Sequence, residues 1–442
     1  MGEERRSGRR LLAVGVVAMV AAPLAVWWFS PGRQHTRQDT RLFDDGDGIT
    51  PLTQAARGTY NRLIEAMHQA KTLSYVSRYE REVEGRVRTV CTYRVWLKKP
   101  NFFRMETRSS SGELGGILIG DGTRLWIYWP NGRPQWEYVV ESEADRKTRF
   151  TSYMTKPAPR GQHSILHEAP FLGAGMGLPI LDASAFHGHS DSLERYLDAV
   201  QSAGAETIGG EDCDKIEVSL VDHQRSWSLW LSKRDHLPRQ VKEVVHVSTD
   251  VVTHERWSSV AIDQEIPDAM FAWTPPAGCT EWKLPDEEDS LLKPGAKAPG
   301  FDLTSVDGGR IKLSDFRGKA VWLCFWRVGC PPCRQEMPHL QSLYAKYKDR
   351  GLVVLGVNVS DDGTITREFL HRCGVTFPNI LDTSIAAQEV YSRDYGVGSI
   401  PVNYLINGDG IVVDRWIGYP EGNTRENSAL RRLGLGVAES EP

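Results

Sequence analysis

The sequence contains few cysteines, and their scarcity limits the chemistry that they can carry. Seven of the 442 residues are cysteine, and a single pair, Cys330 and Cys333, has the two-residue spacing that is typical of zinc and redox sites. A structural zinc ion needs four Cys or His ligands, and no second pair of this spacing completes such a set. Redox chemistry is therefore the better interpretation of this pair, and we expect no metal and no other cofactor.

The chain also lacks a large excess of charge of either sign. The 53 basic and 57 acidic residues leave a net charge of −4, and no basic stripe interleaved with aromatic residues runs through the sequence. We therefore expect no nucleic-acid partner. The sequence also lacks internal repeats, and its length predicts two or three globular domains.

Long apolar runs are absent except near the N-terminus. Arginines precede an uncharged apolar run from Leu11 to Phe29, which as a helix would span roughly 28 Å, close to the thickness of a bilayer core. Trp27 and Trp28 stand at its far end, where aromatic rings favour the membrane interface. The run is longer than the apolar core of a usual cleavable signal peptide, which favours an uncleaved anchor. The positive-inside rule then predicts a single-pass inner-membrane protein with everything after Ser30 on the periplasmic side.

Polar stretches divide the rest of the chain. An acidic stretch without apolar periodicity, Asp286-Glu-Glu-Asp289, marks one boundary. We predict a basic tail with an anchor helix, a linker, a first domain, an acidic linker and a second domain over residues 1–29, 30–50, 51–278, 279–291 and 292–442, respectively.

The first domain combines one helical pattern with many strand patterns. Apolar side chains recur at helical spacing from Ala56 to Met67, and they alternate with other residues from Cys91 to Leu97. A second helix is predicted at Ser192–Val200. Further strands are predicted at Gly116–Ile119, Arg124–Trp129, Lys215–Val221, Ser226–Leu231 and Arg239–Val247. The expected fold is α+β, with a curved and mostly antiparallel sheet and a few helices against it.

Four stretches of this domain carry a family resemblance, namely Trp96–Arg104, Gly120–Tyr128, Leu229–Pro238 and Phe271–Gly278. Their succession of strand and turn motifs resembles the LolA-type lipoprotein-carrier superfamily. The resemblance implies an open half-barrel covered by helices, whose concave face holds acyl chains or a peptide partner. It therefore allows a lipid or lipoprotein ligand, and it brings no catalytic residue.

Two further sets of residues in this domain have the spacing or the residue type of a site. His163 with His167, and His187 with His189, have metal-ligand spacing, but no nearby cysteine or clear carboxylate completes a set, so we expect loop histidines. Exported cysteines tend to pair, so one structural disulfide is a candidate among Cys91, Cys213 and Cys279, and the sequence leaves the pairing open.

The pair Cys330 and Cys333 lies where a buried strand is expected to turn into a helix. Residues 320–326 form a continuous apolar run, and residues 334–348 carry apolar side chains close to helical spacing. A thiol at a helix N-terminus meets unpaired backbone N–H groups and the positive end of the helix dipole, which favour the thiolate. Cys330, the outer sulfur, is therefore the predicted nucleophile for thiol–disulfide exchange. Cys333 lies one turn further in and can resolve a mixed disulfide.

The second domain alternates strands and helices around this pair. An opening strand pair comes first, and the redox strand and helix follow it. The later elements are a strand at Leu352–Val359, a helix at Thr364–Arg372, a strand at Phe377–Leu381, a helix at Ile385–Tyr395, a hairpin from Ser399–Ile406 to Ile411–Ile417, and a last helix. This order predicts a thioredoxin-like α/β fold.

These motifs resemble the membrane-anchored TlpA/ResA group of thioredoxin-like proteins, which are kin of the peroxiredoxin-like redoxins. The resemblance implies that Cys330 attacks and Cys333 resolves. It also implies that Pro401 is a cis-proline that guides a substrate backbone, and that Glu336 helps to shuttle protons. Without the resemblance, Glu336 would be interpreted as a solvated first-turn carboxylate and Pro401 as an ordinary trans-proline.

Two positions depart from the family pattern. Gly329 stands where a tryptophan usually precedes the first cysteine, which removes a flat surface beside the sulfur. Cys324 stands where thioredoxins bury an acid on the central strand, and we expect it to serve as a small apolar core residue. Glu336 is then expected to carry the proton transfer alone.

The combined prediction is a membrane-anchored, exported thiol–disulfide oxidoreductase, and a reductase in preference to an oxidant. The family resemblance implies envelope proteins with disulfides, apocytochrome among them, as substrates, and a membrane thiol reductase as electron donor. One alternative is a thiol peroxidase, although the residues before Cys330 lack the Pro-x-x-x-Thr/Ser-x-x-Cys signature. Another is an envelope protein that binds or senses lipid or lipoprotein and carries a redox-responsive domain.

Overall fold

The computed structural model describes residues 51–83, 85–122, 124–131, 150–154, 181, 183–187, 196–279, 287–419 and 424–435. The expected anchor and linker, and also His163, His167 and His189, lie outside these ranges. Within them, none of the helices is both long and apolar enough to cross a bilayer.

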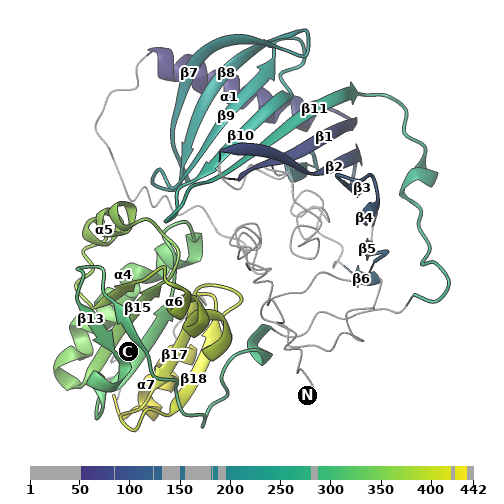
Figure 1. The fold of residues 1–442 in the computed structure, drawn as a ribbon. Helices are drawn as coiled ribbons and strands as arrows, with labels where there is room; N and C mark the ends of the chain where they lie inside the picture. Colours follow the sequence, from purple (N-terminus) through teal and green to yellow (C-terminus); the bar gives the residue numbers. More distant parts are fainter. Residues whose placement is uncertain are drawn as a thin grey trace, which may run out of the picture.

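The first domain is built on one antiparallel sheet of 11 strands. The sheet consists of two meanders, β1–β6 and β7–β11, which are joined by the pairing of β1 with β11. The strand order is therefore β6-β5-β4-β3-β2-β1-β11-β10-β9-β8-β7. Figure 1 shows that the sheet is strongly curved. The strands are β1 (Thr72–Val83), β2 (Arg86–Lys98), β3 (Phe102–Ser109), β4 (Leu114–Asp121), β5 (Arg124–Tyr128), β6 (Phe150–Met154), β7 (Leu197–Ile208), β8 (Glu211–Leu220), β9 (Arg225–Ser232), β10 (Pro238–Val245) and β11 (Val251–Ile262).

Helix α1 (Pro51–Gln69) lies on this sheet, as its apolar stripe predicts. Ala56, Tyr60, Leu63 and Met67 are buried in one core with side chains of the sheet. Short 3-10 helices at Ala183–His187 and Asp268–Phe271 complete the described part of the domain. The expected α+β fold with a large antiparallel sheet is confirmed.

The helix expected at Ser192–Val200 is wrong over its described part, because Leu197–Ile208 forms strand β7, and residues 192–195 lie outside the described ranges. This strand pairs with β8 through a two-residue turn at Gly209 and Gly210, which both have positive φ, as the tightest hairpin turns require. Pairing across the hairpin satisfies the backbone of β7, and this tertiary constraint outweighs a short run of apolar residues at helical spacing.

The structural disulfide considered for the first domain does not form, since Cys91, Cys213 and Cys279 are free thiols. Cys91 lies on β2 and Cys213 on β8, with four strands of the same sheet between them. Strands are spaced about 4.8 Å apart, so this separation far exceeds the roughly 7 Å that a disulfide can bridge.

The second domain has a five-stranded central sheet in the order β16-β15-β14-β17-β18. The first three of these strands are parallel, and the last two form an antiparallel hairpin. The strands are β14 (Ala320–Phe325), β15 (Leu352–Asn358), β16 (Asn379–Leu381), β17 (Val402–Ile406) and β18 (Val412–Ile417), preceded by the small pair β12 (Asp302–Thr304) and β13 (Arg310–Lys312). The helices are α4 (Pro331–Tyr347), α5 (Gly363–Arg372), α6 (Ile385–Glu389) with a π-helical turn at Val390–Asp394, and α7 (Thr424–Arg432). The thioredoxin-like prediction is confirmed.

Strand β14 lies at the centre of this sheet, and Val321–Phe325 are all buried. Gly356 pairs with Cys324 from the neighbouring strand β15. A Cβ atom at Gly356 would lie 2.0 Å from the Asn379 side-chain oxygen and 2.8 Å from the Trp326 indole nitrogen. The Trp326 indole N–H donates a hydrogen bond to the Asn379 side-chain oxygen at 3.1 Å. This hydrogen bond lies so close to the β15 backbone that only a residue without a Cβ atom fits at position 356.

We therefore expect Gly356→Ala to destabilise the second domain by about 1–3 kcal/mol, the usual cost of overpacking a core. Denaturant unfolding followed by tryptophan fluorescence measures this change. Gly300→Ala is the matched control, because a Cβ atom there meets nothing within 4 Å. Equal unfolding midpoints for the two variants would contradict the packing argument.

Candidate active site

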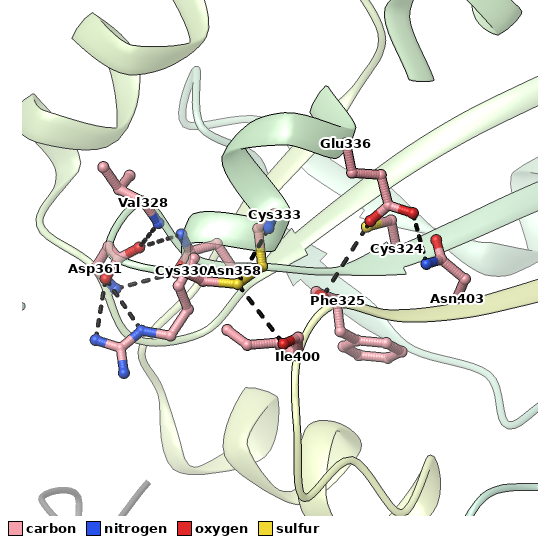
Figure 2. Close-up of a disulfide and its surroundings, with 11 residues drawn as sticks. Cys324, Phe325, Val328, Cys330, Cys333, Glu336, Asn358, Asp361, Ile400 and Asn403 are labelled. Atoms are coloured by element: carbon pink, nitrogen blue, oxygen red, sulfur yellow. Dashed lines mark hydrogen bonds and ion pairs between the residues drawn. A yellow bond between two sulfur atoms is a disulfide. The ribbon is translucent and has the colours of Figure 1, made fainter. Parts of the chain in front are cut away.

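Cys330 and Cys333 form a disulfide at the start of helix α4 (Figure 2). Cys330 is the N-cap residue of the helix, and its Sγ accepts a hydrogen bond from the backbone N–H of Cys333 at 3.2 Å. Pro331 and Pro332 occupy the first turn, where a missing N–H costs no helical hydrogen bond. The contact from the Cys333 N–H stabilises negative charge on Cys330, because charge-assisted hydrogen bonds are the stronger ones.

A buried carboxylate fixes the loop between β14 and Cys330. The side chain of Asp361 is completely buried, and its Oδ1 accepts hydrogen bonds from Nε and Nη2 of Arg327 at 3.2 and 3.1 Å. Its Oδ2 accepts from the backbone N–H of Val328 at 2.6 Å and from the Asn358 amide at 2.7 Å. The backbone leading into Cys330 is thereby held in place from the end of β15.

Pro401 lies across from the disulfide, at the start of β17, and the Ile400–Pro401 peptide bond is cis. Cys330 Sγ is 3.6 Å from the carbonyl oxygen of Ile400, the residue that precedes Pro401. The structure therefore places three of the site residues expected from the sequence, Cys330, Cys333 and Pro401, on adjoining elements.

Glu336, the fourth expected residue, lies one helical turn after Cys333 and is fully buried. It is therefore not a solvated carboxylate. Its Oε1 accepts a hydrogen bond from the Asn403 amide at 2.8 Å, and Asn403 in turn accepts from the Trp322 indole at 2.7 Å. Figure 2 shows the carboxyl group of Glu336 between Asn403 and Cys324.

Burial raises the pKa of Glu336 to about 8, with a smaller contribution in the same direction from Glu426, while the hydrogen bond from Asn403 opposes the shift. Glu336 consequently holds its proton near neutral pH. The thiol of Cys324 lies 3.6 Å from Glu336 Oε2, and burial raises the pKa of this thiol well above its ordinary value. Cys324 is therefore a neutral thiol in the core, next to the acid.

Sequence reasoning missed Asp361, Asn358 and Asn403. A sequence signal existed for Asp361, because it follows a predicted parallel strand, and functional groups gather at the carboxyl ends of such strands. Asn403 sits inside an apolar strand, where a lone amide gives no hint of its partner. The described residues contain no cluster of His, Cys, Asp or Glu that could hold a metal ion, and His187 instead contacts the Phe102 carbonyl oxygen at 3.1 Å.

Two known families match parts of the chain. Residues 294–415 match the AhpC/TSA family, and residues 147–283 match a family described as predicted periplasmic protein, DUF2092. In the solved structures, a putative thiol:disulfide interchange protein DsbE from Chlorobium tepidum is 32% identical, covering 33% of this chain and 99% of that chain with a TM-score of 0.30.

Curated relatives match the second domain. The thiol-disulfide oxidoreductase ResA of Bacillus anthracis is 37% identical over 124 residues, which are 28% of this chain and 69% of the relative. ResA of Geobacillus kaustophilus is 39% identical over 125 residues, which are 28% of this chain and 70% of the relative. Through its second domain, the chain belongs to the family of ResA-type thiol-disulfide oxidoreductases.

Proposed function

We propose that the chain is a membrane-anchored, exported reductase that transfers electrons from the dithiol of Cys330 and Cys333 to disulfides of envelope proteins. The observation that carries this proposal is the position of Cys330, which caps helix α4 and accepts the N–H of Cys333 at 3.2 Å. Such a position favours the thiolate, which is the attacking species in disulfide exchange.

The proposed reaction has two exchange steps. The Cys330 thiolate attacks one sulfur of the substrate disulfide, so that a mixed disulfide forms and the other substrate sulfur leaves as a thiolate. The Cys333 thiolate then attacks Cys330 Sγ, which forms the Cys330–Cys333 disulfide and releases the second substrate thiolate. Two electrons have passed to the substrate, and a membrane thiol reductase returns two electrons to the pair.

Two further residues take part in this scheme. Pro401, whose peptide bond is cis and which follows Ile400, the residue in contact with Cys330 Sγ, guides the substrate backbone beside Cys330. The ionised form of Glu336, whose fraction grows as the pH approaches 8, accepts the proton that Cys333 must lose before it can attack; the two residues are three apart and share one face of the helix. A carboxyl group with a pKa near 8 is suited to hold and to release a proton close to neutral pH.

In this proposal, the reaction takes place at the outer face of a membrane. The apolar run Leu11–Phe29 anchors the chain, and both folded domains lie in the periplasm. The first domain acts as a LolA-like half-barrel that binds a partner of the enzyme, a lipoprotein or another envelope protein. Support comes from its single curved sheet with α1 against it and from its match to a predicted periplasmic family.

We expect the Cys330–Cys333 couple to have a reduction potential near that of thioredoxin, about −270 mV, because the proposed role is reduction. Titration of the full chain in dithiothreitol buffers, read by thiol labelling of the two cysteines, measures it. A potential near that of DsbA, about −120 mV, would reverse the proposed direction of electron flow. If the two cysteines form no disulfide in this titration, the proposed thiol–disulfide exchange activity is refuted.

We expect Glu336→Gln to slow the attack of Cys333 on the mixed disulfide by about 100-fold, the lower range for the loss of an acid–base group. The wild-type rate should rise as the pH passes about 8, where Glu336 loses its proton, and the variant should lack this inflection. Single-turnover kinetics of a Cys330 mixed disulfide give both values. Glu389→Gln, on the exposed face of α6, is the control. An unchanged rate and pH profile for Glu336→Gln would refute the role.

The raised pKa also predicts pH-dependent stability. Folded Glu336 keeps its proton up to about pH 8, whereas the unfolded chain loses it near the ordinary value of 4.5. The stabilisation is therefore complete below pH 4.5 and declines as the pH rises to 8, by at most about 1.4 kcal/mol per pH unit. Denaturant unfolding of the oxidised chain across this range should show a flatter dependence for Glu336→Gln. Parallel curves would argue against the buried proton.

A further inference from the structure

A turn of the first domain rests on the active-site loop of the second. The turn between β8 and β9, residues 221–224, is called the cap turn below. Its residue Gln224 is buried, and a Cβ atom placed on Gly329 would lie 1.5 Å from Gln224 Oε1. The amide nitrogen of Gln224 donates a hydrogen bond to Asp361 Oδ1 at 2.6 Å. Gln224 thus occupies the space beside the residue that precedes Cys330.

The same turn makes two ion pairs with the second domain. Asp222 contacts Arg334, the residue that follows Cys333, and it lies 2.9 Å from Nη2 of Arg372 at the end of α5. Asp222 and Arg334 are mostly buried at this contact. Arg334 also lies over the ring of Phe369 at 5.1 Å, which holds its guanidinium toward the cap turn.

The neighbouring turn between β10 and β11 adds backbone contacts. Ser248 N–H donates to the Ser360 carbonyl oxygen at 3.1 Å, and Val247 forms an isolated β-bridge with Asp361. The two turns are linked, because His246 N–H donates to the Gln224 carbonyl oxygen at 2.7 Å. In Figure 1, the end of the sheet that carries these turns reaches the second domain next to α5.

The cap turn has a backbone that is costly to form. Val221, Asp222 and His223 have φ values of 59°, 55° and 61°, a left-handed conformation that residues other than glycine rarely adopt. Asp198 holds it, since its carboxylate accepts the backbone N–H groups of Asp222 at 3.0 Å and His223 at 2.8 Å. The surrounding residues therefore enforce a conformation that directs Asp222 and Gln224 to the second domain.

Both sulfurs are inaccessible in this arrangement, with Cys330 2% and Cys333 0% exposed. The cap turn contacts the residues that flank the pair in the chain, since Gln224 lies beside Gly329 and Asp222 pairs with Arg334. We propose that the cap turn occupies the position of a bound protein substrate and keeps the redox site closed until a substrate displaces it. When Asp222 leaves, Arg334, the residue that follows Cys333, loses its ion-pair partner, so the substrates that displace the cap turn are disulfides with an acidic residue next to the cysteine. This inference rests on the proposed thiol–disulfide exchange.

The first test measures closure in the reduced full chain, as the rate at which iodoacetamide alkylates Cys330, located by peptide mass spectrometry. Asp222→Asn should raise this rate about tenfold, since it removes a charge-assisted contact, while asparagine tolerates the left-handed backbone. Asp214→Asn is the control, because Asp214 lies on β8 and pairs with Lys233 of its own domain. Equal rates for Asp222→Asn and wild type would overturn the cap.

The second test measures substrate choice with two disulfide peptides that differ only in Asp or Asn beside the cysteine. The wild-type chain should reduce the Asp peptide about tenfold faster, and Arg334→Gln should abolish this preference. Equal rates with the two peptides would contradict the proposal that an acidic side chain of the substrate takes the place of Asp222. Alkylation requires no exchange reaction, and disulfide formation by the pair is scored separately in the potential titration. Failure of the cap is therefore distinguishable from failure of the proposed enzyme.

Discussion

The carboxylate of Asp361 is the group on which the arrangement of the active site depends. It receives the Arg327 guanidinium, the Val328 N–H and the Asn358 amide from its own domain, and the Gln224 amide from the other. Removing a buried carboxylate from such a set would leave a buried cation without its partner, which is costly. A single side chain at the end of β15 therefore fixes the loop before the nucleophile and also the docking of the first domain.

This docking gives a physical reason for Gly329. The family resemblance places a tryptophan before the first cysteine, and any side chain here would overlap the carboxamide of Gln224, which lies 1.5 Å from the position of a Cβ atom. The space that a tryptophan side chain would take beside the sulfur is thus occupied by Gln224 of the cap turn. A substitution that looked in the sequence like a loss of recognition is accounted for by contact between two domains.

Local patterns predicted the second domain well, because its signals are contained in short stretches. The apolar run before Cys330 and the helical spacing after it predicted β14, α4 and the position of the disulfide between them. Contacts between distant residues could not be predicted in this way. Gln224 and Asp361 are 137 positions apart, and neither neighbourhood indicates the other. Strand β7 was mistaken for a helix for a related reason, since its pairing with β8 decides its structure.

The two buried acids near the disulfide, Asp361 and Glu336, have different surroundings. Asp361 contacts the cap turn, whereas Glu336 does not. Asp361 is paired with the Arg327 guanidinium and fixes geometry. Glu336 meets an amide and a thiol, with no cation beside it among the described residues, and burial raises its pKa to about 8. The cap turn docks on Asp361, whereas Glu336 lies on the inner face of α4 toward Asn403. The contacts of Glu336 with Asn403 and Cys324 are therefore independent of the docking of the cap turn on Asp361.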